Sequence, residues 1–258
     1  MKWPKWLMMI RHDTSAYNAL RGKKENDPLY QEFLKYWESD PDSKEARGLA
    51  RAVQKKFALG VGDAETALAD AEGRQAFETG VALSRGELPD IVFVSPYKRA
   101  VLTLDHITRG WPALAEIEPI EEERVREQEH GLALLYNDWR VFHVLNPEQK
   151  RLRDIEGPYW YRYPQGESVP DVRARNRDWL RTVTRDFSDK RILVVTHHLN
   201  ILAMRANLDR LSAEDFIRLD EKEKPINCGV TLYRGHPDLG SDGKLLLDYY
   251  NVRHYSSM

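Results

Sequence analysis

The sequence predicts an α/β fold, a three-layer sandwich in which a mostly parallel central sheet is flanked by helices. Three short apolar runs support this prediction: WLMMI at 6–10, DIVFV at 90–94 and RILVV at 191–195. Consecutive rather than alternating apolar residues are typical of strands covered on both faces. Helical patterns precede the second run (AEGRQAFETGVALS) and the third (SVPDVRARNRDWLRTVTRDF), and Ser168 or Asp171 is the expected N-cap of the latter helix.

Two regions interrupt this alternation of strands and helices. Residues from about 20 to 66 are rich in charged and aromatic residues at helical spacing, which predicts a helical insertion. The segment from about 132 to 165 is too long and too aromatic for a plain connection, so we expect a lid-like loop. Near the end, CGVTLYRG and KLLLDYYNV predict a hairpin at the edge of the sheet. We expect one domain over residues 1–258 that carries the insertion.

Composition excludes several classes of partner and site. The chain has 39 basic and 41 acidic residues and a formal net charge of −2, which disfavours nucleic acids and anionic membranes as partners. Cys228 is the only cysteine, so neither an intrachain disulfide nor a cysteine-cluster zinc site is expected. No stretch approaches the roughly 18 apolar residues of a membrane span. We expect a soluble, cytoplasmic protein, with the aromatic insertion as a possible homodimer contact.

Cationic and imidazole side chains follow each of the three predicted strands. Arg11 and His12 follow the first run, Arg99 the second, and His197 the third. Ligands of open α/β sheets bind beyond the carboxyl ends of the strands, so these four side chains are expected to converge. Guanidinium groups for the non-bridging oxygens, one imidazole as nucleophile and another as donor suit a phosphoryl group.

A leaving alkoxide also needs a proton from a carboxylic acid. The stretch EEERVREQEHG contains several candidates, and spacing alone does not choose among them: Glu121, Glu122, Glu123, Glu127 and Glu129.

Five blocks of the sequence, RHDTSAYN, SPYKRAVLTL, RVREQEHG, YPQGES and VVTHHLN, resemble the successive blocks of the histidine phosphatase superfamily. This is the branch that also contains cofactor-dependent phosphoglycerate mutase. The resemblance follows the family's order and covers most of residues 7–233 apart from the insertion. It implies a phosphoglycerate mutase-like fold.

The resemblance also implies roles for individual residues. The family's phosphorylated histidine falls on His12, with Arg11 beside it as a phosphate-binding arginine. The second arginine falls on Arg99, the general acid/base on Glu127 and the second histidine on His197. Two further positions, Ser15 and Asn18, match residues that contact the phosphate or the substrate in relatives.

A third candidate for substrate binding is Arg162. It lies in the aromatic stretch PYWYRYP, which is expected either to pack plainly or to form a lid from which Arg162 reaches a second anionic group of the substrate.

The implied activity is phosphomonoester hydrolysis through a phosphohistidine, as in histidine acid phosphatase-like enzymes, on a small phosphorylated substrate with no metal and no cofactor. One alternative is a phosphoglycerate mutase-type phosphotransferase, although the REQ block is more similar to phosphatase members. Another is a non-catalytic member that binds a phosphorylated ligand or a protein partner. Asp13 and His198 replace family glycines and keep this last alternative open; we expect Asp13 to turn away and cap a helix or bond a neighbouring backbone group.

Overall fold

The structure, a computed structural model, describes residues 2–256 and contains one mixed sheet of six strands in that range. The strands are β1 (Trp6–Arg11), β2 (Ile91–Val94), β3 (Ile120–Glu121), β4 (Arg191–Thr196), β5 (Val230–His236) and β6 (Lys244–Val252). Their order is β3-β2-β4-β1-β5-β6. The first four are parallel, whereas β5 is antiparallel to β1 and to β6. The predicted mostly parallel sheet and its edge hairpin are therefore confirmed, and the short edge strand β3 was not predicted.

The helices lie between and beyond these strands. They are α1 (Ala16–Glu25), α2 (Pro28–Ser39), α3 (Lys44–Lys56), α4 (Arg74–Leu83), α5 (Lys98–Gly110), α6 (Trp139–Leu145), α7 (Pro147–Glu156), α8 (Val169–Asp186), α9 (His198–Leu208) and α10 (Ala213–Lys222). Three short 3-10 helices join them: η1 (Pro112–Glu116), η2 (Glu123–Val125) and η3 (Gly131–Tyr136). The N-cap of α8 is Ser168, which forms a capping box with Asp171, so both residues take part in the predicted helix start.

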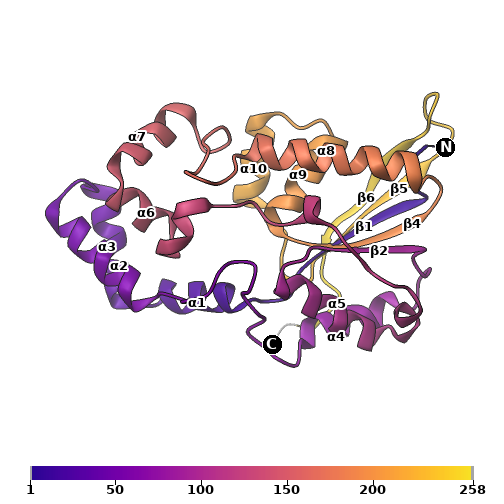
Figure 1. Ribbon diagram of the computed structural model, residues 1–258, viewed down its shortest axis with the longest axis horizontal. Helices are drawn as coiled ribbons and strands as arrows, with labels where there is room; N and C mark the ends of the chain where they lie inside the picture. The colour runs from indigo at the N-terminus through magenta and orange to yellow at the C-terminus, as the bar shows by residue number, and fades with distance from the viewer. Residues whose placement is uncertain (1, 257–258) are drawn as a thin grey trace.

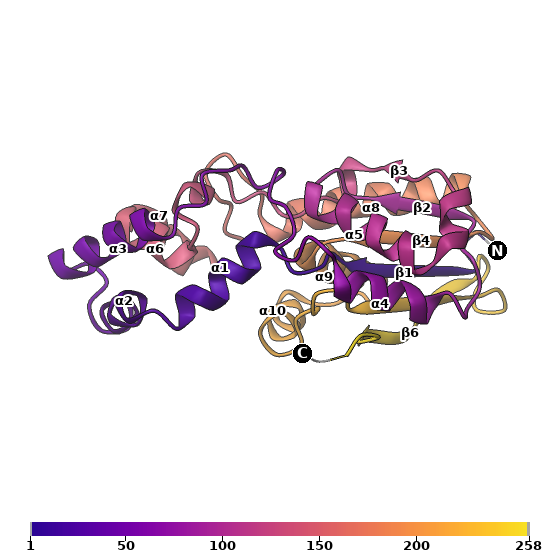
Figure 2. The ribbon, with the colours of Figure 1, turned by 90° about the horizontal axis from the view of Figure 1, so that it is seen from below.

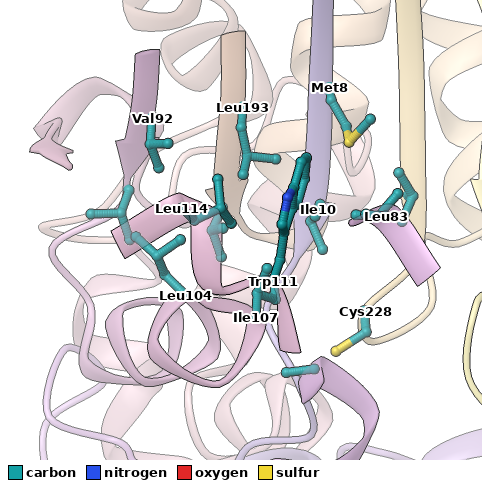
Figure 3. Packing of buried hydrophobic residues seen from close by; sticks show 14 of the residues in the cluster. Met8, Ile10, Leu83, Val92, Leu104, Ile107, Trp111, Leu114, Leu193 and Cys228 are labelled. Carbon is teal, nitrogen blue, oxygen red and sulfur yellow. The ribbon is translucent and has the colours of Figure 1, made fainter. Parts of the chain in front are cut away.

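The sheet is covered on both faces, as the apolar runs predict. In β1, Met8 and Ile10 point to the face covered by α4 and α5, whereas Leu7 and Met9 point to the face covered by α8 and α9. Figure 1 shows these two helical layers on opposite sides of the strands. Figure 3 shows part of the first layer, where Trp111 packs beside Ile10. A strand buried on both sides needs apolar residues at successive positions, because successive side chains point to opposite faces.

A second, smaller core lies in the helical unit, the name used here for α1, α2, α3, α6 and α7. It is built from buried apolar residues of α2, α3 and α6, among them Phe33, Val53 and Val141. Figures 1 and 2 show this unit projecting beyond the carboxyl ends of the parallel strands. The expected helices of the insertion are present, and α1 begins before it, at Ala16.

The prediction that residues 132–165 form a loop was wrong. Much of this segment is helical, since it contains most of η3 and all of α6 and α7. Asp138 caps α6 by accepting from the backbone N–H groups of Arg140 and Val141, and Pro147 begins α7. Because α6 is short, its apolar side chains did not show a helical period, although they pack against α2 and α3.

Candidate active site

The carboxyl end of β1 places His12 beside the end of β4. The two strands pair in parallel with Arg11 opposite Thr196, and the backbone N–H of His12 donates to the Thr196 carbonyl at 2.8 Å. On the other side, Asn227 Nδ2 donates to the His12 carbonyl at 2.9 Å. The backbone of His12 is thus held by two segments that are distant in sequence.

The side chain of His12 is buried and has one defined partner. Its Nδ1 lies 2.6 Å from the carbonyl oxygen of Asp13. A carbonyl only accepts, so Nδ1 carries the hydrogen and Nε2 keeps its lone pair. Burial lowers the pKa of His12 well below its ordinary value, and the positive charges of Arg99 and Arg11 lower it further. The ring is therefore neutral near pH 7, as a nucleophile requires.

His197 faces His12 from the N-terminus of α9. The two ring centroids are 5.1 Å apart, and His197 Nε2 lies 2.7 Å from Ser95 Oγ. Ser95 is fixed in turn by its backbone N–H, which donates to the Val195 carbonyl. Burial lowers the pKa of His197 well below its ordinary value, and the nearby charge of Arg99 adds to this effect.

Both predicted arginines reach the same region. Arg11 Nη1 donates to the Pro225 carbonyl at 2.6 Å, and the Arg99 guanidinium lies 4.9 Å from the centre of the Tyr97 ring, which itself contacts His197. Burial lowers the pKa of Arg11, with Glu127 opposing and Arg99 adding to this shift. Arg99 and Glu127 are therefore close enough to Arg11 for their charges to act on it.

Glu127 is joined to the N-terminus of α9. Its Oε1 accepts from the backbone N–H of Leu199 at 3.1 Å and from that of Gln128 at 3.0 Å. The N-terminus of a helix is a favourable place for a carboxylate. Both amides bond Oε1 rather than Oε2.

A buried ion pair supports the segment that carries Glu127. Arg175 of α8 donates to the carbonyls of Arg124 at 2.7 Å and Glu127 at 2.9 Å, and its Nε is 2.9 Å from Glu167 Oε1. The Glu167 carbonyl also accepts from Gln128 Nε2 at 2.8 Å. These bonds fix the backbone on both sides of the carboxylate without touching it.

Asp13 turns away from the site, as expected. Its Oδ2 accepts from the backbone N–H of Ala76 at 3.1 Å, in the first turn of α4. The N-cap of that helix is Gly73, which has no side chain to accept this bond. The carboxylate of Asp13 therefore caps α4 although it is distant from that helix in the sequence. Burial raises the pKa of Asp13.

His198, the other departure from the family pattern, is paired with a neighbouring helix. Its Nε2 lies 2.7 Å from Asp220 Oδ1 of α10. Burial raises the pKa of Asp220, but the contact with His198 outweighs it and leaves this pKa below its ordinary value.

The three predicted substrate-binding residues have other partners. Ser15 and Asn18 form the capping box of α1, with Asn18 Oδ1 3.0 Å from Ser15 Oγ. Arg162 is exposed and forms an ion pair with Asp171 at 2.5 Å. Within residues 2–256 no contact joins Arg162 to the other predicted site residues, so the structure does not bring it to them. A role for these three side chains in substrate binding stays a prediction.

Two buried nitrogens in the cluster lack a hydrogen-bond partner among the described residues. They are Arg11 Nε, a donor, and His197 Nδ1. Buried polar groups are nearly always paired, so these atoms indicate a ligand site. An anion is the ligand that suits them.

Comparison with known proteins places the chain in a family. The sequence model of the histidine phosphatase superfamily (branch 1) matches residues 50–239, which is more than half of the chain. The chain belongs to the histidine phosphatase superfamily. The matched range begins after Arg11 and His12 and includes Arg99, Glu127 and His197.

Relatives in the histidine phosphatase superfamily include two kinds of named protein. A phosphoglycerate mutase-like protein of Arabidopsis thaliana is 27% identical over 228 residues, which cover 84% of this chain and 70% of the relative. Phosphoserine phosphatase 1 of Hydrogenobacter thermophilus is 31% identical over 133 residues, 51% of this chain and 59% of the relative.

Solved structures share the fold of this histidine phosphatase. A putative alpha-ribazole-5'-P phosphatase from Escherichia coli has a TM-score of 0.67 at 16% identity, covering 99% of this chain and 100% of that one. A mycobacterial glucosyl-3-phosphoglycerate phosphatase, solved with inorganic phosphate, has a TM-score of 0.64 at 19% identity, covering 98% and 100%. At these identities the likeness shows the fold, which confirms the phosphoglycerate mutase-like architecture.

Neither a metal site nor a membrane-spanning helix is found in residues 2–256. In residues 2–256 no group of three or more His, Cys, Asp or Glu side chains is placed to hold a metal ion. No helix of the described part of the chain is both long and apolar enough to cross a membrane.

Several residues that build the site were not predicted from the sequence. Ser95 and Tyr97 stand in the block SPYKRA beside Arg99, so their contacts with His197 were available from that block. Arg175 is one of several arginines of α8, a helix with one buried side, and the helical pattern does not single it out. Asp63, which contacts Arg99, lies in the segment interpreted as an insertion and gave no signal.

Proposed function

We propose that this histidine phosphatase hydrolyses phosphomonoesters through a phosphohistidine on His12. The observation that carries the proposal is that a free His12 Nε2 lies in the same cluster as two buried nitrogens without a partner among residues 2–256, Arg11 Nε and His197 Nδ1. An orphaned guanidinium donor beside a neutral imidazole suits the oxygens and the phosphorus of one phosphoryl group.

The first step forms a bond between His12 Nε2 and phosphorus and breaks the ester P–O bond. Arg11, Arg99 and His197 donate to the equatorial oxygens, where negative charge develops. Ser95 Oγ–H can donate to His197 Nε2, which leaves the hydrogen of His197 on Nδ1, facing the anion. The Glu127 carboxyl gives its proton to the leaving alkoxide.

The second step returns the enzyme to its starting state. Water attacks phosphorus, its proton passes to the Glu127 carboxylate, and the P–N bond to His12 breaks to release inorganic phosphate. The proposal assigns no step to a metal or a cofactor.

The test measures phosphate release from p-nitrophenyl phosphate and from a panel of small phosphomonoesters. We expect His12→Ala to lower kcat/KM by about 1,000-fold or more, because the nucleophile is lost. The matched control is His236→Ala, an exposed histidine at the end of β5. Full activity in His12→Ala would overturn the proposal, and loss of activity in EDTA would refute its metal-free form.

Quenching of the wild type in alkaline denaturant after mixing with labelled substrate should trap phosphate on His12, because the P–N bond of a phosphohistidine survives alkali but not acid. On the acid side, the pH profile of kcat/KM should show no ionisation near pH 6.5, the ordinary value for a histidine, since the pKa of His12 is well below that value.

The names of the plant relatives make phosphoglycerate mutase activity a second candidate. Interconversion of phosphoglycerates without phosphate release would favour it, and a folded wild type that neither releases nor traps phosphate would favour a non-catalytic binder.

A further inference from the structure

Asp63 holds one edge of the Arg99 guanidinium. Arg99 Nη1 donates to the Asp63 carbonyl at 2.6 Å and to its Oδ1 at 3.0 Å, and Nη2 donates to Oδ2 at 3.3 Å. The Arg99 side chain is 5% exposed and that of Asp63 is 20% exposed. A bidentate contact between two largely buried groups fixes the plane of the guanidinium as well as its position.

The loop that carries Asp63 is itself fixed to the site. The backbone N–H of Lys98, next to Arg99, donates to the Ala64 carbonyl at 2.9 Å. Further along, Ala16 N–H donates to the Ala67 carbonyl at 2.9 Å, and Ala69 N–H to the Thr14 carbonyl at 2.8 Å. These bonds tie the loop to the start of α5 and to the segment after His12. Asp63 is therefore a fixed support rather than a mobile cover.

The bonds to Asp63 determine which donors of Arg99 are free. A guanidinium has five N–H groups, and Asp63 engages both on Nη1 and one on Nη2. The Nε–H and the second Nη2–H form the adjacent edge, and within residues 2–256 no protein group accepts from them. Two parallel donors on one edge match two oxygens of a phosphoryl group.

We propose that Asp63 is a positioning residue that turns the Nε/Nη2 edge of Arg99 toward the phosphoryl group. This inference rests on the proposed function, since it takes Arg99 as a phosphate-binding group. It assigns a role to a residue that contacts Arg99 rather than the reacting atoms.

A role in orientation and a role in charge predict opposite effects of substitution. Asp63 carries a negative charge close to the site, so removing that charge alone would strengthen the binding of an anion. If Asp63 orients Arg99, its removal weakens anion binding instead, because the guanidinium is free to rotate. The dissociation constant for inorganic phosphate therefore distinguishes the two roles without requiring turnover.

The experiment compares Asp63→Ala and the milder Asp63→Asn with the wild type. We expect Asp63→Ala to lower kcat/KM for p-nitrophenyl phosphate by 10-fold to 100-fold and to raise the phosphate dissociation constant about 10-fold. Asp63→Asn keeps one acceptor oxygen and should have a smaller effect in the same direction. Glu65→Gln, an exposed carboxylate in the same loop, is the matched control and should have no effect.

A double-substitution cycle with Arg99→Ala separates positioning from general support of the fold. If Asp63 acts through Arg99, Asp63→Ala should change phosphate binding less than twofold in the Arg99→Ala background. An equal loss in both backgrounds, unchanged phosphate affinity in Asp63→Ala, or tighter phosphate binding would each overturn the inference. If the wild type binds phosphate but releases none from esters, the hydrolase proposal fails while the binding cycle still decides the role of Asp63.

Discussion

The floor of the candidate active site and the helical unit are fixed by different forces. The floor here means His12, Ser95, Glu127 and His197, together with the residues that hold them in place. On the floor, His12 and Ser95 are held through backbone hydrogen bonds to β4, so their positions follow from the pairing of the central strands. The helical unit has no strand and depends on a small apolar core with a buried ion pair between Lys24 and Asp138. The sheet thus positions the chemical groups, whereas the core of the helical unit depends on side-chain contacts.

This difference indicates how each region should respond to substitution. On the floor, Arg175 is the side chain that holds the segment carrying Glu127. The helical unit instead has buried polar side chains at its centre, including His143, whose two ring nitrogens have no partner among the described residues. We expect changes on the floor to lower turnover as well as stability, and changes in the unit to lower stability alone.

The largest effect is expected from Arg175→Met. It leaves Glu167 buried without its main cation and releases the carbonyls of Arg124 and Glu127. We expect a loss of about 3–5 kcal/mol in the free energy of unfolding and about a 100-fold lower kcat/KM. Urea denaturation and steady-state kinetics measure the two effects, and the control is Arg177→Met, an exposed arginine of the same helix. Normal kinetics in a destabilised Arg175→Met would show that the acid does not depend on this anchor.

The next effect is expected from Lys24→Met in the helical unit. The side chains of Lys24 and Asp138 are 6% and 4% exposed, and Asp138 also accepts from Tyr30 Oη at 2.6 Å. Burial raises the pKa of Asp138, but the contact with Lys24 outweighs it and leaves the carboxylate ionised. Removing Lys24 should therefore cost about 3 kcal/mol of unfolding free energy.

The turnover of Lys24→Met sharpens the comparison between the two regions. Its kcat for p-nitrophenyl phosphate should stay within twofold of the wild type, because no floor residue moves. Lys23→Met, an exposed neighbour, is the control. A large fall in kcat with little change in stability would reverse the assignment of roles.

The smallest effect is a pH dependence of stability that arises from His143. This side chain is fully buried among aromatic rings, and burial lowers its pKa to about 4. The unfolded chain binds a proton near pH 6.5, before the folded chain does, so stability is lost as pH falls from about 6.5 to 4. The loss should reach about 3 kcal/mol by pH 4, at 1.36 kcal/mol for each unit of pKa difference.

His143→Leu removes this titration and serves as the test. The difference in unfolding free energy between pH 7 and pH 4.5 should be smaller in His143→Leu than in the wild type by about 2 kcal/mol. Denaturation curves at the two pH values measure it. The same acid sensitivity in both proteins would assign the effect to other groups.

The sequence predicts which residues converge at the strand ends, but it does not predict the residues that support them, such as Asp63. The reason is physical. Arg11, His12 and His197 follow buried strands, so their convergence comes from the geometry of a parallel sheet. Asp63 reaches Arg99 from a position 36 residues away along a loop without a periodic pattern. Contacts of this kind depend on tertiary packing that no local pattern records.

Other parts of the fold were missed for related reasons. The strand β3 has only two residues, which is too short to show any period. The helix α6 has seven residues, two of them aromatic, and was taken for part of a loop. The capping role of Asp13 was predicted in kind, but its partner Ala76 is 63 positions away and needed the structure.

The bond from the His12 N–H to the Thr196 carbonyl links His12 to the two central strands. Amides in such positions exchange their hydrogens with solvent only when the whole domain opens, whereas amides of the helical unit can exchange through partial opening. The backbone of His12 is therefore expected to open as rarely as the backbone of the central strands. Sequence change in the helical unit can alter what approaches His12 without disturbing how His12 is held.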